Sequence, residues 1–290
     1  MKEINTLLFS GGGIKCYSIL GSLKFLIENN IIKENFKGIK EIFYTSGSAI
    51  FTFPLFIGFS INATIEIFKN IDYSLINIID LTSLEYLLSK FGLKDIREFY
   101  YIIEIILKKK NIDIDINLKQ LYHLNNININ FKTVNITKDT IEYLNHINNP
   151  DLTLKEAIIM TSCIPIIFSP IEHNGSLYID GGMVGNFPYE KINNKDHSLG
   201  FNIVSTNTSL DTSTHKESFN YEDITKYIIY LYNIHNNSPY KSNKKRHIQI
   251  EIKLDSLSPG FNFNAFIKNL DQLFNKGYQD TKLQFKGLNG

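Results

Sequence analysis

The chain has 290 residues, of which 43% are hydrophobic and 20% charged, a composition typical of a globular protein. Its formal net charge of +1 gives no electrostatic reason to expect a nucleic-acid partner. The two cysteines, Cys16 and Cys163, are too few for a disulfide framework and belong to no metal-binding pattern. We therefore expect a reducing compartment, no metal and no cofactor.

The N-terminus lacks the long apolar segment and the small-residue cleavage site of a secretory signal. The most apolar stretch, residues 49–61, is too short to span a bilayer and contains Pro54 and Gly58. This stretch predicts a buried core helix. Together these features predict a cytoplasmic protein without a transmembrane helix.

Predicted strands and helices alternate along the chain. In chain order they are strand 6–9, helix 14–28, strand 41–45, helix 47–58, helices 84–90, 96–109 and 118–124, strands 131–136 and 140–143, helix 154–162, strands 177–179, 201–204 and 248–253, and helix 266–282. Residues 205–217 and 241–246 are predicted to be polar loops. The alternation predicts a single α/β domain over residues 1–290, with three αβα layers around a mostly parallel central sheet.

The segment Gly11-Gly12-Gly13-Ile14-Lys15 lies between the first predicted strand and the first predicted helix. Glycines permit a sharp turn with unobstructed N–H groups, and the start of a helix favours an anion. The loop therefore suits a phosphate or an oxyanion, or serves the turn alone. A dinucleotide fingerprint needs glycine after Lys15, and a P-loop needs Gly-Lys-Ser/Thr, so both nucleotide patterns are incomplete.

Ser46 lies between predicted strand 41–45 and predicted helix 47–58. A nucleophile elbow places its serine at such a turn, usually within G-x-S-x-G. Here Tyr44 and Ser48 occupy the two glycine positions, while Gly47 supplies one small residue. Taken alone, the segment is better interpreted as a helix N-cap formed by Ser46 or Ser48.

Asp180, followed by Gly181 and Gly182, comes directly after predicted strand 177–179. A carboxylate that is hydrogen-bonded to a serine hydroxyl can act as its general base. The alternative is an Asp-Gly turn without a chemical role, which is a common local structure.

In this order, the three segments resemble the patatin-like phospholipase family, whose motifs are G-G-G-x-[KR]-G, G-x-S-x-G and D-G-[GA]. Residues 157–170 and the segment Asn186-Phe187-Pro188 resemble further parts of the family pattern, and the resemblance covers residues 5–205. The sequence departs from the pattern at positions 16, 44 and 48. Tyr44 is the main departure, because its bulk is expected to strain the turn or narrow the pocket.

The resemblance implies a lipid acyl hydrolase of the phospholipase A type, in which Ser46 is the nucleophile and Asp180 its general base. Backbone N–H groups of the glycine loop would hold the oxyanion, each worth about 3 kcal/mol in the transition state. The implied oxyanion residues are Gly11, Gly12, Gly13 and Ile14, and the supporting residues are Lys15, Gly47, Gly181 and Gly182. Lys15 orients the loop or attracts a head group, although a lone lysine is more often solvated.

A phospholipid or another lipid ester is the expected substrate. This substrate class implies peripheral contact with a membrane surface, for which the basic runs 108–110 and 244–246 are candidates.

Two other functional hypotheses remain. A catalytically impaired lipid-binding or regulatory protein is motivated by the imperfect elbow. An α/β-hydrolase order of Ser, Asp and His would use one of four downstream histidines, but the glycine loop lies too early in the chain for that fold. These histidines are His197, His215, His235 and His247.

Overall fold

The computed structural model describes residues 3–73, 83–191, 197–205, 248–254 and 263–288. The predicted loop 241–246 and nearly all of the loop 205–217 lie outside these residues.

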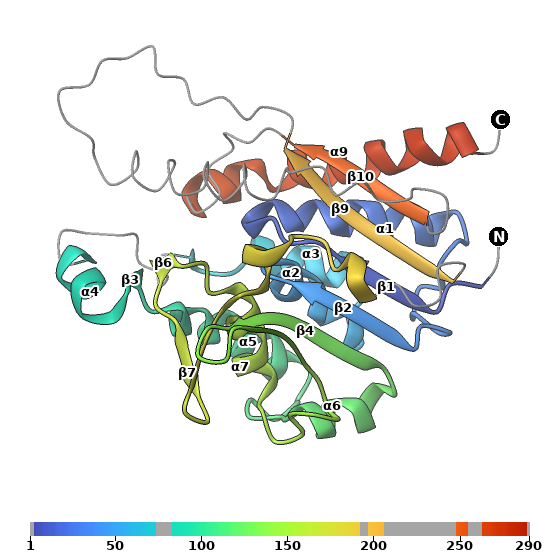
Figure 1. Cartoon of the computed structure of the whole chain (residues 1–290). Helices are drawn as coiled ribbons and strands as arrows, with labels where there is room; N and C mark the ends of the chain where they lie inside the picture. The colour runs from blue at the N-terminus through green and yellow to red at the C-terminus, as the bar shows by residue number, and fades with distance from the viewer. Residues whose placement is uncertain (1–2, 74–82, 192–196, 206–247, 255–262, 289–290) are drawn as a thin grey trace, which may run out of the picture.

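A central sheet of eight strands has the order β10-β9-β1-β2-β4-β8-β7, with β5 also paired to β4 (Figure 1). Its strands are β1 (Thr6–Phe9), β2 (Glu41–Thr45), β4 (Asn128–Asn135), β5 (Thr140–Leu144), β7 (Ile171–His173), β8 (Ser176–Asp180), β9 (Ser198–Ser205) and β10 (Ile248–Leu254). The strands from β10 to β4 are all parallel, whereas β5, β7 and β8 form antiparallel pairs. The predicted α/β class with a mostly parallel central sheet is confirmed.

Except for α4, which contributes no described residue to it, the helices pack against the sheet in one large core. They are α1 (Ser18–Glu28), α2 (Ser48–Phe56), α3 (Ile61–Lys69), α4 (Ser83–Lys90), α5 (Tyr100–Lys109), α6 (Leu118–Asn125), α7 (Leu154–Ser162) and α9 (Phe263–Leu288). On the opposite face of the sheet, a small cluster contains Leu8, Phe43, Tyr143 and Phe187, and none of its described members lies in an α-helix. The long helices α1 and α9 lie side by side (Figure 1).

Glycine permits the close approach of α1 and α9. A methyl group at Gly21 would overlap the carbonyl of Phe274, and one at Gly277 would overlap the carbonyl of Ser18. The Ser22 hydroxyl crosses the same contact and donates to the Gly277 carbonyl at 3.1 Å. The C-terminal helix is thereby attached to the first helix after the glycine loop.

A second sheet has only two strands, β3 (Gly92–Lys94) and β6 (Ile166–Phe168). These strands, together with β7 and α3, were not predicted. A strand of three residues is too short for its alternation to stand out from the surrounding loop. This small sheet joins the segment after α4 to the segment after α7, beside the candidate site.

Every residue of α2 is buried, so the prediction of a core helix within residues 49–61 is confirmed. Among the described helices, none combines the length and apolarity that crossing a bilayer requires.

Candidate active site

The glycine loop follows β1 and is held from two sides. The Gly11 N–H donates to the Asn186 carbonyl at 3.1 Å, and the Asn186 side-chain amide donates back to the Gly11 carbonyl at 2.8 Å. Ser10 Oγ accepts the Ile203 N–H of β9 at 2.9 Å. Because Asn186 already accepts the Gly11 N–H, this expected oxyanion donor is not free to bind an oxyanion in this structure.

Gly12, Gly13 and Ile14 lie where the 3₁₀-helix η1 (Gly13–Tyr17) begins. N–H groups in the first turn of a helix have no intrahelical acceptor, so they remain available to a ligand. Gly13 has a φ of +55°, which glycine adopts without strain. Lys15 is only 5% exposed, so the expectation of a solvated lysine is wrong.

Ser46 forms a strained turn between β2 and α2. Its φ of +58° lies in the left-handed region, which is uncommon for a residue with a side chain and is associated with functional sites. The N-cap of α2 is Gly47 and has no side-chain cap, so the interpretation of Ser46 or Ser48 as an N-cap is wrong. A Cβ at Gly47 would lie 2.5 Å from the Gly13 carbonyl, so glycine allows this turn to touch the glycine loop.

Tyr44 and Ser48, which replace the two glycines of the elbow pattern, both fit into the structure without blocking the site. The Tyr44 ring is fully buried in the sheet core, with centroids 5.4 Å from Phe9 and 5.5 Å from Phe131. It does not line the pocket beside Ser46. Ser48 Oγ donates to the Thr45 carbonyl at 2.7 Å and accepts the Thr45 N–H at 3.3 Å, so it braces the turn.

Asp180 ends β8 and is fully buried. Burial raises the pKa of its carboxyl to about 7, while the Ser46 hydroxyl, the Gly182 N–H and the positive charge of Lys132 oppose this rise. Oδ1 accepts the Gly182 N–H at 2.7 Å. Oδ2 has no partner of good hydrogen-bond geometry among the described residues, although Ser46 is near enough to influence the pKa. The Ser46 hydroxyl and the Asp180 carboxylate are therefore neighbours, and Oδ2 accepts no hydrogen bond from Ser46 in this structure.

Thr161 of α7 connects the two candidate catalytic segments. Its Oγ1 accepts the Ser46 N–H at 3.0 Å and donates to the Lys132 carbonyl at 2.6 Å. Lys132 lies on β4, where the next residue, Thr133, pairs with Asp180. Sequence reasoning gave Thr161 no role of its own; the only signal was its place in the family-like stretch 157–170.

An ion pair between buried Lys132 and the partly exposed Glu190 lies near Asp180. Lys132 is 1% exposed, and its Nζ lies 2.9 Å from Glu190 Oε1 and 2.9 Å from the Gly185 carbonyl. The charge of Lys132 and a hydrogen bond from Tyr143 help to hold the pKa of Glu190 below its usual range, although burial opposes them. A methyl group at Gly181 would overlap the Lys132 carbonyl, so glycine lets the Asp180 turn pack directly on β4.

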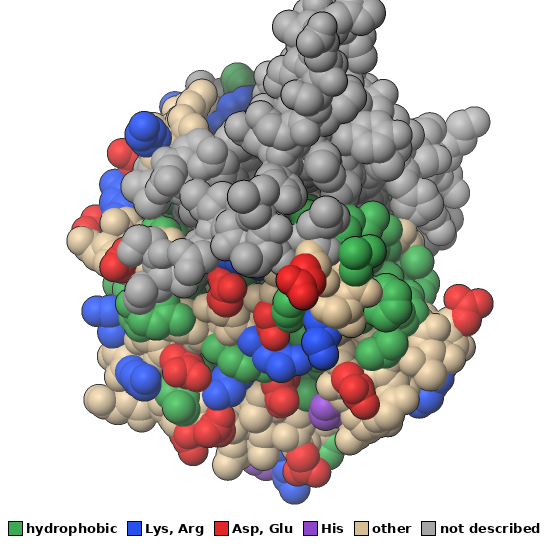
Figure 2. Space-filling model, turned by 90° about the vertical axis from the view of Figure 1, so that its left-hand side faces the viewer, with side chains coloured by type: hydrophobic (Ala, Val, Ile, Leu, Met, Phe, Trp, Pro, Cys, Tyr) green, Lys and Arg blue, Asp and Glu red, His purple; other side chains and the backbone are tan. Residues whose placement is uncertain are grey.

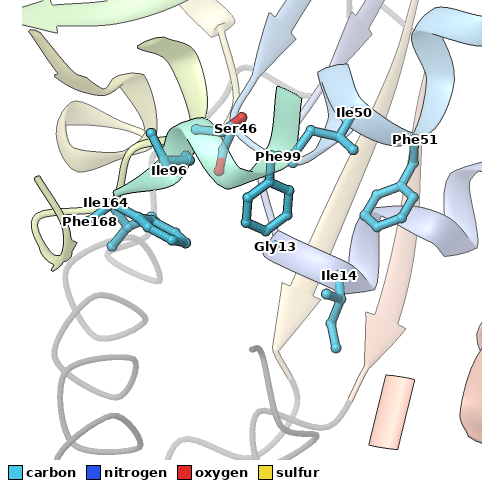
Figure 3. A pocket seen from close by; sticks show the side chains of 11 residues that line it. Gly13, Ile14, Ser46, Ile50, Phe51, Ile96, Phe99, Ile164 and Phe168 are labelled. Atoms are coloured by element: carbon cyan, nitrogen blue, oxygen red, sulfur yellow. The ribbon is translucent and has the colours of Figure 1, made fainter. Parts of the chain in front are cut away.

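A hydrophobic pocket opens beside Ser46 (Figure 3). Its lining comes from the glycine loop with η1, from α2, from η3 (Ile96–Phe99) and from the chain around β6. The lining residues are Gly13, Ile14, Ser46, Gly47, Ile50, Phe51, Ile96, Phe99, Ser162, Ile164 and Phe168. The walls are hydrophobic except at two serines, so the pocket suits a hydrocarbon chain.

His197 lies at the wrong end of the sheet to serve Ser46. It precedes β9, and its Nδ1 is 2.7 Å from the Glu3 carbonyl, near the start of β1. Ser46 instead follows the C-terminal end of the parallel strand β2. The other three candidate histidines lie outside the described residues. Within the described ranges, no group of three or more His, Cys, Asp or Glu residues is arranged to hold a metal ion.

A family model described as patatin-like phospholipase matches residues 7–191. An uncharacterized protein of Acanthamoeba polyphaga mimivirus is 27% identical over 286 residues, which cover 97% of this chain and 94% of the viral protein. A probable lipid hydrolase of Invertebrate iridescent virus 6 is 28% identical over 221 residues, covering 75% of this chain and 73% of that protein.

Among solved structures, VipD from Legionella pneumophila aligns with a TM-score of 0.57 at 15% identity. The alignment covers 98% of this chain and 67% of VipD. At this identity the likeness establishes a shared fold.

Proposed function

The chain belongs to the patatin-like phospholipase family, and from this premise we propose that it hydrolyses carboxylic esters of lipids through Ser46 and Asp180. The observation that carries the proposal is the strained Ser46 turn, at a φ of +58°, beside a fully buried Asp180. Strain at a serine that follows a parallel strand is typical of a nucleophile elbow.

In the proposed reaction, Ser46 Oγ attacks the ester carbonyl carbon while Asp180 accepts the hydroxyl proton. The resulting oxyanion lies against the N–H groups of Gly12 and Gly13, with Ile14 next in line. Collapse of this intermediate breaks the bond to the alkoxy oxygen, which leaves as an alcohol with the proton from Asp180. Asp180 then activates water, which releases the fatty acid and restores Ser46.

The hydrophobic pocket supports a lipid as the acyl donor. Its walls offer Ile50, Phe51, Ile96, Phe99 and Phe168 to a hydrocarbon chain. Burying such a chain gains free energy in proportion to the apolar area removed from water. A phospholipid or another long-chain ester therefore fits the site better than a short polar ester.

The rival hypothesis, a catalytically impaired lipid-binding protein, arose from Tyr44 and Ser48. Tyr44 packs in the core and Ser48 braces the turn, so neither side chain obstructs the pocket. The structural reason for preferring an inactive protein is therefore weak.

A long-chain fluorogenic ester and a phospholipid vesicle, each assayed with wild type, Ser46→Ala and Asp180→Asn, test the proposal. We expect both variants to lose turnover while retaining the wild-type melting temperature or a higher one. Ser60→Ala is the matched control, since the Ser60 side chain caps α3 by accepting the Ala63 N–H, away from the pocket. Wild-type turnover in the Ser46→Ala protein would contradict the proposal, and an inactive wild type that binds vesicles would favour the rival.

A further inference from the structure

One polar side chain of the pocket has no part in the mechanism above. Ser162 ends α7 and is 5% exposed. Its Oγ is buried and has no hydrogen-bond partner among the described residues. Ser162 and Ser46 are the two polar side chains in the pocket lining, so Ser162 provides a single hydroxyl in a hydrophobic wall.

Two neighbouring buried hydroxyls, those of Thr52 and Thr161, are satisfied, whereas those of Thr45 and Tyr44 have no partner among the described residues but do not line the pocket. Thr52 donates to the Ser48 carbonyl at 2.8 Å, and Thr161 donates to the Lys132 carbonyl at 2.6 Å. A serine within a helix usually bonds in the same way, to the carbonyl one turn back. A buried hydroxyl without a partner destabilises the fold, so such a group in a binding pocket points to a ligand atom that completes it.

The position of Ser162 indicates which ligand atom this is. The preceding residue, Thr161, holds the Ser46 backbone, so Ser162 lies close to the reacting carbon. Figure 3 shows Ile164 on one side of Ser46, with Gly13 and Ile14 on the other. The carbonyl oxygen of a bound ester is directed toward the glycine loop in the proposed reaction. The alkoxy oxygen is one of the two other substituents of the reacting carbon, and the end of α7 lies in the same pocket as Ser46.

We propose that Ser162 is a substrate-contacting residue whose hydroxyl donates a hydrogen bond to the alkoxy oxygen of the bound ester. Negative charge grows on this oxygen as the bond to the acyl carbon breaks, so the hydrogen bond strengthens toward the transition state. Ser162 transfers no proton; Asp180 still supplies the proton of the alcohol. The inference rests on the proposed function and adds a determinant for the leaving group.

Leaving-group chemistry provides the test. Wild type and Ser162→Ala are compared on a p-nitrophenyl ester and an ethyl ester of the same long-chain fatty acid, with fatty-acid release as the readout. We expect kcat/KM on the ethyl ester to fall by about 10- to 100-fold, the equivalent of one lost hydrogen bond to the substrate. The loss on the p-nitrophenyl ester is expected to be much smaller, because p-nitrophenolate leaves without assistance. The melting temperature should stay the same or rise, since the variant removes an unsatisfied buried group.

Ser22→Ala is the matched control. It removes a fully buried hydroxyl that is satisfied by the Gly277 carbonyl, far from the pocket. We expect the opposite pair of results: a lower melting temperature, with activity on both esters retained.

Equal losses on both esters, or no loss on either, would overturn the role of Ser162. Ser46→Ala is assayed alongside to separate the two hypotheses. Retained turnover in Ser46→Ala would contradict the proposed function itself. An inactive Ser46→Ala together with a fully active Ser162→Ala would overturn only the inference about Ser162.

Discussion

At the scale of single residues, the site depends on the burial and the pKa of one carboxyl group, that of Asp180. Asp180 is fully buried, and burial disfavours its charged form more than Ser46, Gly182 and Lys132 together favour it. The resulting pKa of about 7 suits a general base, because the group then accepts and returns a proton near neutral pH. The same burial means that ionisation of Asp180 lowers the free energy of unfolding.

This raised pKa predicts the pH dependence of both activity and stability. Asp180 must be ionised to act as a base, so kcat/KM is expected to fall as the pH drops below about 7. The folded-state pKa lies above the usual value of 3.8, so Asp180 favours folding most at low pH, and this contribution is lost as the pH rises from about 4 through about 7. Asp180→Asn should therefore melt at a higher temperature than wild type at pH 8, and the difference should disappear toward pH 4. A melting difference that is independent of pH would count against a raised pKa.

At the scale of elements, the site is a junction of five segments. The glycine loop after β1 touches the elbow after β2, and Thr161 of α7 bridges the elbow to β4. The Asp180 turn after β8 then packs on β4 at Lys132. The segments are joined by close glycine contacts and by the short, buried Thr161 side chain, so their relative positions do not depend on long flexible side chains.

Lys132 is a positioning residue of this junction, and its effect on the pKa of Asp180 can be tested directly. Its charge lowers the pKa of Asp180, so Lys132→Met is expected to raise that pKa and move the acid limb of kcat/KM to higher pH. Methionine keeps an apolar stem of similar length, and the remaining Glu190 is partly exposed, which limits the damage to the fold.

The matched control for this prediction is Lys155→Met. Lys155 of α7 pairs with Glu104 at 3.2 Å and with Asp115 at 2.7 Å, and it is not among the groups that act on Asp180. This variant should lose its ion pairs without moving the acid limb. An identical acid limb in wild type and Lys132→Met, measured over the full pH profile, would contradict the electrostatic role of Lys132.

At the scale of the whole molecule, the exposed hydrophobic residues beside the pocket bear on how a lipid substrate is reached. Leu88 is 80% exposed and Phe91 is 74% exposed, at the end of α4 and just before β3. Ile166, which pairs with Gly92 at the same end of the small sheet, is 46% exposed. Figure 2 shows the side of the molecule that carries α4, where hydrophobic side chains reach the surface between charged ones.

The basic run at residues 108–110 is a weaker candidate for membrane contact. Lys108 lies 3.7 Å from Glu104, and Lys110 bonds the Gly58 carbonyl and covers the Phe59 ring. Part of its charge is therefore already engaged within the protein. The second basic run, 244–246, lies outside the described residues.

We expect Phe91→Asp to reduce hydrolysis of phospholipid in vesicles while leaving hydrolysis of a soluble monomeric ester unchanged. The physical reason is that a carboxylate is costly to bring against a lipid surface, whereas the catalytic groups are untouched. Aspartate also tolerates the positive φ of +59° at this position, so the local backbone should be retained.

Leu124→Asp serves as the control, because Leu124 is a 53% exposed residue of α6, away from the pocket. Equal vesicle activity of the Phe91→Asp and Leu124→Asp proteins would remove this face as the membrane contact.

The main elements of the fold could be predicted from local pattern. Strands β1 and β2 and helix α7 begin and end where predicted, because each is a compact apolar run bounded by glycine, proline or polar residues. The three-residue strands and α3 were missed. The extent of the chain as a single domain, residues 1–290, stays a prediction.

The sequence by itself determined the order of the glycine loop, the serine turn and the Asp-Gly-Gly segment, since each is a short motif fixed by neighbouring residues. Only the tertiary structure decided what surrounds them: Asn186 engages the Gly11 N–H, Thr161 holds the Ser46 turn, and Ser162 lines the pocket with a hydroxyl that has no partner in the described part of the chain. The environment of Asp180 also depends on residues far away in the chain. Burial and long-range hydrogen bonds arise only when distant segments pack together, so a local pattern does not contain them.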